Sequence, residues 1–180
     1  MCLSLVGSEM CIRDRLYAKD PLSIAKEGDK IIFIRHALAP GGGDPSGFKI
    51  DDCKTQRNLN RVGIQQSKNI GKLFKNNKIP VDKVLSSQWC RCKDTAKYAF
   101  KNYFEFSALN STFQSSFAKN EPKQLKQLQT FVNNWDGDGG NLILITHYVV
   151  ILESLNKAVS SGEIVITDRK LNILGSITKY

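Results

Sequence analysis

Short apolar runs alternate along the chain with segments in which apolar residues recur every three or four positions. The runs "IIFIRH" and "NLILITH" predict strands at Lys30–His36 and 141–147, because both are apolar on two faces and rich in β-branched residues. Such runs are typical of strands buried in a parallel sheet. "VDKVLSS" (81–87) predicts a third strand, and "EIVITD" (163–168) with "KLNILGSITK" (170–179) predict a hairpin at one sheet edge.

Helical periods fill the intervals between these strands. Asn60 is expected to cap a helix that runs to about Asn76, and further helices are expected near 90–101, from Pro122 onward, and near 149–157. Residues 103–121 follow neither period. Alternating strands and helices predict an α/β fold, a three-layer α/β/α sandwich with a largely parallel central sheet. The apolar residues that set the two longest helical patterns are Val62, Ile70, Leu73 and Phe74, and Leu125, Leu128, Val132 and Trp135.

One domain is expected at residues 30–180, since 180 residues suffice for one ordinary domain with a core. The first fifteen residues show neither the helical nor the strand spacing of apolar residues. Their segment "LVGSEMCIRDR" resembles the translation of a transposase sequencing adapter. We therefore expect residues 1–15 to be a disordered artefact. Residues 16–29 are expected to be a leader, and "LYAKDPLS" is open to interpretation as the tail of a truncated signal peptide. If this segment is the remnant of a signal peptide, the protein is expected to be periplasmic or exported. Without a signal peptide, it is expected to be cytoplasmic.

Composition narrows the class of partner. No apolar run approaches the roughly 20 residues that span a bilayer, so no membrane span is expected. The formal net charge of +9 favours anionic partners. However, the lysines are spread over the chain, with no run of five like charges and no basic segment interleaved with aromatic residues. Nucleic-acid binding is therefore not expected.

The cysteines do not indicate a metal site. Beyond residue 15 the chain has Cys53, Cys90 and Cys92, and "CRC" lacks the spacing of a zinc knuckle. Only two histidines are present. A disulfide between Cys53 and either Cys90 or Cys92 remains open for an exported protein.

Both histidines of the chain come at the end of a predicted parallel strand. His36 ends "IIFIRH" and His147 ends "LILITH". Ligands of open α/β sheets bind beyond the carboxyl ends of the strands, where the loops diverge. Either histidine alone would be read as an ordinary core or loop residue. The pair, with Arg35 beside His36, predicts a shared polar crevice.

Arginines add to this crevice. "SSQWCRCKDTA" places Arg91 one turn into the helix that follows the third strand, among residues untypical of a solvent-exposed face. A guanidinium group offers a planar fork that suits phosphate oxygens. Arg35 and Arg91 therefore predict a site for a dianion. Arg57, in "TQRNLN", is a candidate third arginine, with a loop salt bridge as the alternative.

Four motifs in this order resemble branch one of the histidine phosphatase superfamily, which also contains phosphoglycerate mutases. They are "RHA", "RNLNRVGIQQSKNIG", "SSQWCRCKDTA" and "THYVVI", and the resemblance covers about residues 30–168. The first motif departs from the usual Arg-His-Gly by Ala37. The resemblance implies a phosphoglycerate mutase-like sandwich and a metal-independent phosphatase without a cofactor, which would hydrolyse a phosphomonoester, a phosphohistidine or a phosphoanhydride.

The resemblance also implies roles for the site residues. His36 would be the nucleophile that forms a phosphohistidine, oriented by a backbone carbonyl in the 37–43 loop. Arg35, Arg91 and His147 would hold the oxygens of the transferring phosphoryl group. The substrate would be a phosphorylated small molecule or a phosphohistidine protein.

The general acid of the family has no clear counterpart. Ser111 falls near the place of the glutamate that mutases use, and Tyr148 follows His147 where another branch has aspartate. Asp44 is the favoured candidate, with Asp52 and Glu121 as alternatives. A phosphohistidine or phosphoanhydride substrate would need no such acid. A phosphoglycerate mutase-type phosphotransferase and a catalytically weak phosphate-binding module remain alternative functions.

Overall fold

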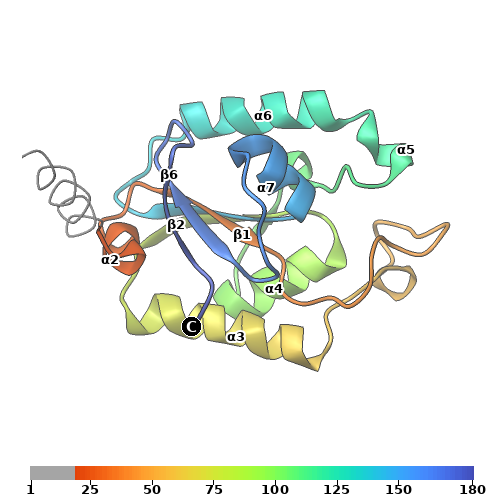
Figure 1. The fold of residues 1–180 in the computed structure, drawn as a ribbon, viewed down its shortest axis with the longest axis horizontal. Coiled ribbons are helices and arrows are strands. Elements are labelled where there is room, and N and C mark those ends of the chain that lie inside the picture. Colours follow the sequence, from red (N-terminus) through yellow and green to blue (C-terminus); the bar gives the residue numbers. More distant parts are fainter. Residues whose placement is uncertain (1–18) are drawn as a thin grey trace, which may run out of the picture.

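The computed structural model describes residues 19–180 and has one six-stranded sheet at its centre (Figure 1). The strands lie in the order β3-β2-β4-β1-β5-β6. The first four of these pair in parallel, whereas β5 is antiparallel to both β1 and β6. The predicted edge hairpin is therefore confirmed. The strands are β1 (Ile31–Arg35), β2 (Val81–Ser86), β3 (Phe104–Glu105), β4 (Asn141–Thr146), β5 (Ile164–Thr167) and β6 (Ile173–Ile177).

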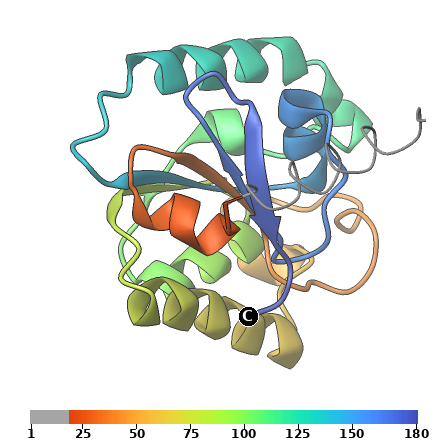
Figure 2. The ribbon, with the colours of Figure 1, turned by 60° about the vertical axis from the view of Figure 1, so that its left-hand side comes forward.

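Helices cover both faces of the sheet, which confirms the three-layer α/β/α sandwich. In Figure 1, α6 and α7 lie above the sheet and α3 and α4 lie below it, and Figure 2 shows α2 on the same side as α3. The helices are α2 (Pro21–Lys26), α3 (Arg61–Asn76), α4 (Cys90–Phe100), α5 (Ser115–Ala118), α6 (Glu121–Asn134) and α7 (Tyr148–Leu155). Short 3₁₀ turns occupy Cys53–Thr55 and Ser107–Leu109.

Two hydrophobic cores result from the alternation of side chains along the strands. In β1, Ile31 and Phe33 join the core under α6 and α7, while Ile32 and Ile34 join the core over α2, α3 and α4. All four side chains have no exposed surface. Burial of each contributes roughly 1.5–3 kcal/mol, so a strand of this composition is stable only at the centre of the sheet. This central position fixes the end of β1 at the middle of the sheet's carboxyl edge.

Helix α3 holds the start of the loop that follows β1. Asn60 caps the helix by accepting a hydrogen bond of 2.8 Å from the Gly63 N–H, as predicted. A Cβ atom on Gly63 would lie 2.1 Å from the carbonyl oxygen of Leu38, so only glycine allows this approach. Val62, the first apolar residue of the helical pattern in the sequence, does not lie on the buried face, because its side chain is 60% exposed. The buried face of the helix begins one position later, at Gly63.

The folded chain begins before the expected boundary at Lys30. Helix α2 contributes Ile24 and Ala25 to the core that contains α3 and α4. The side-chain amide of Asn141 donates a hydrogen bond of 2.8 Å to the carbonyl of Ala25, which ties α2 to the start of β4. Within the predicted leader, the structure therefore has a packed helix. The expected artefact at residues 1–15 lies outside the described residues.

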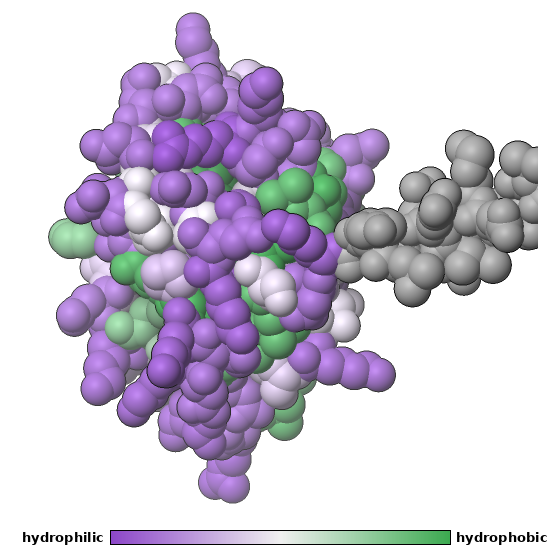
Figure 3. Space-filling model, turned by 90° about the vertical axis from the view of Figure 1, so that its left-hand side faces the viewer, coloured by the Kyte–Doolittle hydropathy of each residue, from purple (hydrophilic) through white to green (hydrophobic). Residues whose placement is uncertain are grey.

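Nothing in the described part of the chain is suited to cross a bilayer, since none of its helices is both long and apolar enough. The side of the molecule that carries α2 is mostly hydrophilic and is interrupted only by small apolar areas (Figure 3). Exposed apolar residues scattered in this way are normal for a folded domain.

A disulfide joins Cys53 to Cys90, which decides between the two pairings that the sequence left open. Cys92 is buried with a free thiol. The bond connects the long loop after β1 to the first residue of α4. Two distant parts of the same sheet edge are therefore covalently linked.

We expect reduction of this disulfide to destabilise the fold, because it closes a chain segment with a sequence separation of 37 residues. Loop-closure entropy predicts a loss of about 3–4 kcal/mol in the free energy of unfolding. Urea denaturation with and without a dithiol reductant measures this loss. The double variant Cys53→Ser/Cys90→Ser is the control, since its unfolding should not respond to the reductant. An unchanged midpoint for the wild-type protein under reduction would contradict the expectation.

Candidate active site

His36 lies directly after β1 and is oriented by its own neighbour. Its backbone N–H donates to the carbonyl of Thr146 over 2.9 Å, and its ring Nδ1 lies 2.8 Å from the carbonyl oxygen of Ala37. Because a carbonyl only accepts, Nδ1 carries the hydrogen and Nε2 keeps a free lone pair. Burial, with a contribution from Arg91, lowers the pKa of His36 well below its ordinary value. The ring is therefore neutral, and a loop carbonyl orients it as predicted.

His147 lies directly after β4, with its ring centroid 5.4 Å from that of His36. Its Nδ1 lies 3.4 Å from a terminal nitrogen of Arg91, and its Nε2 lies 2.9 Å from the hydroxyl of Ser87. A guanidinium only donates, so Nδ1 accepts and Nε2–H donates to Ser87. Ser87 in turn donates to the side-chain oxygen of Asn110 over 3.1 Å. Burial is the main cause that lowers the pKa of His147 well below its ordinary value, and the positive charge of Arg91 is the second cause.

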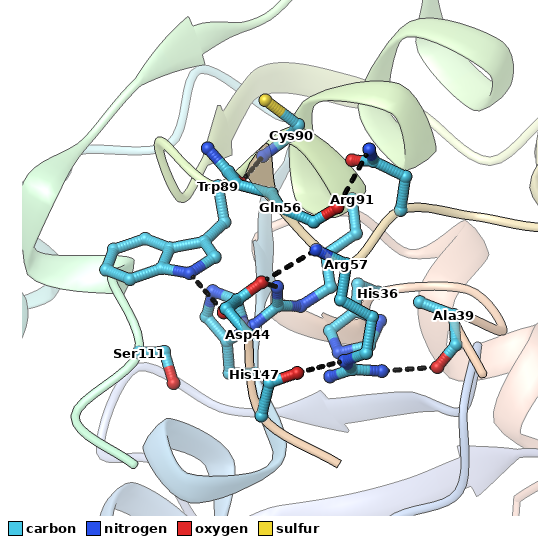
Figure 4. A network of polar contacts seen from close by, with 12 residues as sticks. His36, Ala39, Asp44, Gln56, Arg57, Trp89, Cys90, Arg91, Ser111 and His147 are labelled. Atoms are coloured by element: carbon cyan, nitrogen blue, oxygen red, sulfur yellow. Dashed lines mark hydrogen bonds and ion pairs between the residues drawn. The ribbon is translucent and has the colours of Figure 1, made fainter. Parts of the chain in front are cut away.

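Arg91 forms a buried ion pair with Asp44. The two side chains are 3% and 1% exposed, and their closest nitrogen and oxygen atoms are 2.8 Å apart. The carboxylate accepts two further hydrogen bonds, of 3.0 Å from the backbone N–H of Arg57 and 2.9 Å from the indole N–H of Trp89. Figure 4 shows Asp44 between the indole and the guanidinium groups. Three donors therefore fix the position of this carboxylate beside Arg91.

The other two arginines are held by backbone carbonyls. Arg57 donates over 2.9 Å to the carbonyl of Gly43 and also donates to the carbonyl of Ala39. Its side chain therefore supports the loop that contains glycines 41–43, called the glycine loop below. Arg35 donates over 2.7 Å to the carbonyl of Val159, and its guanidinium lies 5.4 Å from the ring centroid of Tyr148. Neither arginine pairs with a carboxylate in the described chain, so their charges remain available to a ligand.

These side chains surround a cavity of about 170 Å³. Three guanidinium groups and one carboxylate, Asp44, line it together with the two histidines, which leaves two positive charges without a counterion. The buried Nε atoms of Arg35 and Arg91 also have no hydrogen-bond partner among the described residues. A phosphoryl dianion carries the charge that this cavity lacks.

The structure brings together all six residues predicted for the site. His36, Arg35, Arg91, His147, Arg57 and Asp44 line the same cavity. The two alternative acids do not: Asp52 caps the turn at Cys53–Thr55, and Glu121 accepts a hydrogen bond of 3.1 Å from Thr112. Ser111 does line the cavity, as its place in the sequence suggested.

Sequence reasoning missed the groups that hold His147 and Asp44. Ser87 is the last residue of the predicted strand at 81–87, and Trp89 lies two residues before Arg91, but neither position indicates a contact with His147 or Asp44. Asn110 lies in the stretch that follows no period, so no sequence signal indicates its contact with Ser87. Across residues 19–180, no three histidine, cysteine, aspartate or glutamate side chains gather in a way that could hold a metal ion.

The chain shares its fold with solved phosphatase structures. No protein-family model matches it, and no curated protein matches it in sequence. It is similar to a protein provisionally named phosphohistidine phosphatase SixA from Agrobacterium tumefaciens, with a TM-score of 0.58 and 14% identity over 85% of this chain and 99% of that chain. The protein histidine phosphatase SixA complexed with tungstate gives a TM-score of 0.54 and 14% identity over 83% and 96% of the two chains.

A third structure has a different named substrate. It is a protein provisionally named alpha-ribazole-5'-P phosphatase from Escherichia coli, with a TM-score of 0.57 and 13% identity over 81% of this chain and 94% of that chain. At these identities the likeness shows the fold. It confirms the predicted phosphoglycerate mutase-like sandwich, which is the fold that the resemblance of the motifs implied.

Since burial lowers the pKa of both His36 and His147, we expect neither ring to take up a proton in the folded protein between pH 7.5 and 5.5. In the unfolded chain each ring titrates near pH 6.5, so the unfolded state binds more protons as the pH falls. Stability is then lost as the pH falls below about 6.5, by on the order of 1 kcal/mol for each histidine that stays neutral in the folded protein.

Proton NMR of the imidazole rings tests this directly, because the sequence has only two histidines. Their chemical shifts should stay constant over this range without a ligand. A titration midpoint near 6.5 for either ring would contradict its assigned burial. The double variant His36→Asn/His147→Asn is the stability control and should lose less stability than the wild-type protein between pH 7.5 and 5.5.

Proposed function

We propose that this protein is a metal-independent phosphatase that works through a phosphohistidine on His36. The observation that carries the proposal is that His36 lines a cavity with two surplus positive charges, with its Nδ1–H bonded to the Ala37 carbonyl and its Nε2 lone pair free. The fold likeness to phosphatases supports the same class of activity.

In the first step, Nε2 of His36 attacks phosphorus and the bond from phosphorus to the leaving group breaks. The leaving group departs with the electron pair, and the Nδ1–H bond to Ala37 stabilises the positive charge that develops on the ring. In the second step, water attacks phosphorus and the nitrogen–phosphorus bond breaks. The electron pair returns to Nε2, and inorganic phosphate is released.

Arg35, Arg57 and Arg91 stabilise the negative charge of the phosphoryl oxygens in both steps. His147 adds a donor once it is protonated on Nδ1. Positive charge from Arg91 is one cause of its lowered pKa, and a bound dianion offsets that charge. Its Nε2–H bond to Ser87 keeps the ring in place, with Nδ1 on the side of Arg91, during this change.

Asp44 is proposed to position Arg91 instead of acting as the general acid. Its oxygens are engaged by Arg91, Trp89 and the backbone of Arg57, and no other carboxylate lines the cavity. Leaving groups that need no proton are therefore favoured, which supports a phosphohistidine or phosphoanhydride substrate. The mutase alternative is weaker, because Ser111, which lines the cavity, falls near the place of the glutamate that mutases use. A phosphate-binding module would bind phosphate without hydrolysing a substrate, so a turnover assay distinguishes it from a phosphatase.

We expect His36→Ala to abolish hydrolysis of p-nitrophenyl phosphate in EDTA and to prevent formation of a phosphoenzyme. The wild-type protein should turn over under the same conditions and form a labelled intermediate that rapid quenching traps. Circular dichroism checks that the variant is folded. Residual turnover by His36→Ala above a trace would assign the nucleophile elsewhere, and binding without turnover by the wild-type protein would favour the phosphate-binding module.

Arg91→Ala should lower kcat/KM by more than tenfold, equivalent to about 1.4 kcal/mol of transition-state stabilisation. It removes a charged contact to the phosphoryl group and leaves Asp44 buried without its cation. Lys75→Ala, an exposed change on α3, is the matched control and should have no effect. A loss below tenfold would place Arg91 outside the reaction.

Asp44→Asn separates positioning from acid catalysis. If Asp44 only positions Arg91, kcat falls by the same factor for p-nitrophenyl phosphate and for an alkyl phosphate, because both need the arginine. A general acid would give an additional loss of about 10²–10⁴-fold for the alkyl ester alone. Asp52→Asn is the control, since Asp52 caps a turn outside the cavity. A selective loss on the alkyl phosphate would restore Asp44 as the acid.

A further inference from the structure

The cavity can enclose the phosphoryl group but not a whole substrate. Its volume of about 170 Å³ is smaller than the roughly 300–1,000 Å³ of pockets that enclose drug-sized ligands. With His36 and the arginines around the phosphoryl group, the leaving group must lie at the mouth. The nature of the residues there determines which leaving groups fit.

An exposed aromatic ring stands at this mouth. Phe113 lines the cavity and yet is 65% exposed, unlike the phenylalanine at the centre of the sheet, Phe33, which is fully buried. A Cβ atom on Gly43 would lie 3.7 Å from the ring carbon Cε1 of Phe113, so the ring stands beside the glycine loop. The three glycines 41–43 have no side chains to cover it.

Polar contacts of the neighbouring residues place Phe113 at the mouth. The side-chain amide of Gln114 accepts from the backbone N–H of Asp44 at 3.4 Å and donates to its carbonyl at 3.3 Å. The backbone N–H of Phe113 donates to the hydroxyl of Ser111 at 3.4 Å. The segment is therefore tied to the residue that pairs with Arg91, while the ring itself faces solvent.

The other aromatic residue at the cavity already has a partner. The ring of Tyr148 lies 5.4 Å from the guanidinium of Arg35, an attractive cation–π arrangement. Phe113 has no aromatic or cationic partner of this kind in the described chain. Its ring face is therefore free for a ligand.

We infer that Phe113 is a specificity-determining residue that stacks on the leaving group of the substrate. The substrate class is a phosphoryl group attached to a planar aromatic or heteroaromatic ring. This inference rests on the proposed function, since it assumes that the phosphoryl group enters the cavity. A stacked aromatic pair changes an equilibrium by about three- to tenfold.

The test compares two substrates whose leaving groups depart without a proton: p-nitrophenyl phosphate, which has a ring, and acetyl phosphate, which has none. Phe113→Ala should raise the ratio of KM for the aryl substrate to KM for acetyl phosphate by about three- to tenfold. Phe113→Tyr should restore the wild-type ratio, because it keeps the ring. Phe104→Ala is the matched control, since Phe104 is 66% exposed and lies outside the cavity.

An unchanged ratio in Phe113→Ala, or an equal change in Phe104→Ala, would overturn the inference alone. In that case the wild-type protein still hydrolyses both substrates and still depends on His36. If the wild-type protein hydrolyses neither substrate, the proposed function fails and the inference fails with it.

Discussion

Arg91 and Asp44 face each other where water is almost excluded, and two segments of the chain meet at this ion pair. Removing either partner would leave an uncompensated buried charge, which is strongly destabilising. The pair therefore requires the loop after β1 to close over the start of α4. Three consecutive residues at the start of α4 hold that loop. Trp89 and Arg91 both bind the carboxylate of Asp44. Cys90 forms the disulfide with Cys53, and its backbone N–H donates a hydrogen bond of 3.0 Å to the side chain of Gln56.

The parallel sheet and the loops divide the proposed chemistry between them. Strand ends provide His36 and His147, and the helix after β2 provides Arg91, so these groups are fixed by a core with almost no freedom to shift. The glycine loop and the segment around Phe113 form the mouth and contribute little to either core. The proposed chemistry at phosphorus thus depends on rigid elements, and the proposed recognition of the leaving group depends on loops.

Patterns in the sequence were sufficient for the elements that a core determines. Buried strands have a composition that only the centre of a parallel sheet tolerates, so the positions of His36 and His147 followed from strand ends alone. Asp44 was predicted to lie in the cavity, but its ion pair with Arg91 was not predicted, because a partner 47 positions away leaves no mark on local periodicity. The packed helix α2 was not predicted, because six residues are too few to show a helical spacing of apolar residues that would distinguish them from a leader. Val62 belongs to the apolar pattern of α3 in the sequence, but the buried face of that helix begins one residue later, at Gly63.

The two surplus charges of the cavity act on every phosphate species alike. For a phosphatase this means that inorganic phosphate, the product, meets the same arginines as the substrate and competes with it. Release of the product must therefore overcome the attraction that bound the substrate. The turnover of such an enzyme falls as free phosphate rises, which couples its rate to the phosphate supply of its surroundings.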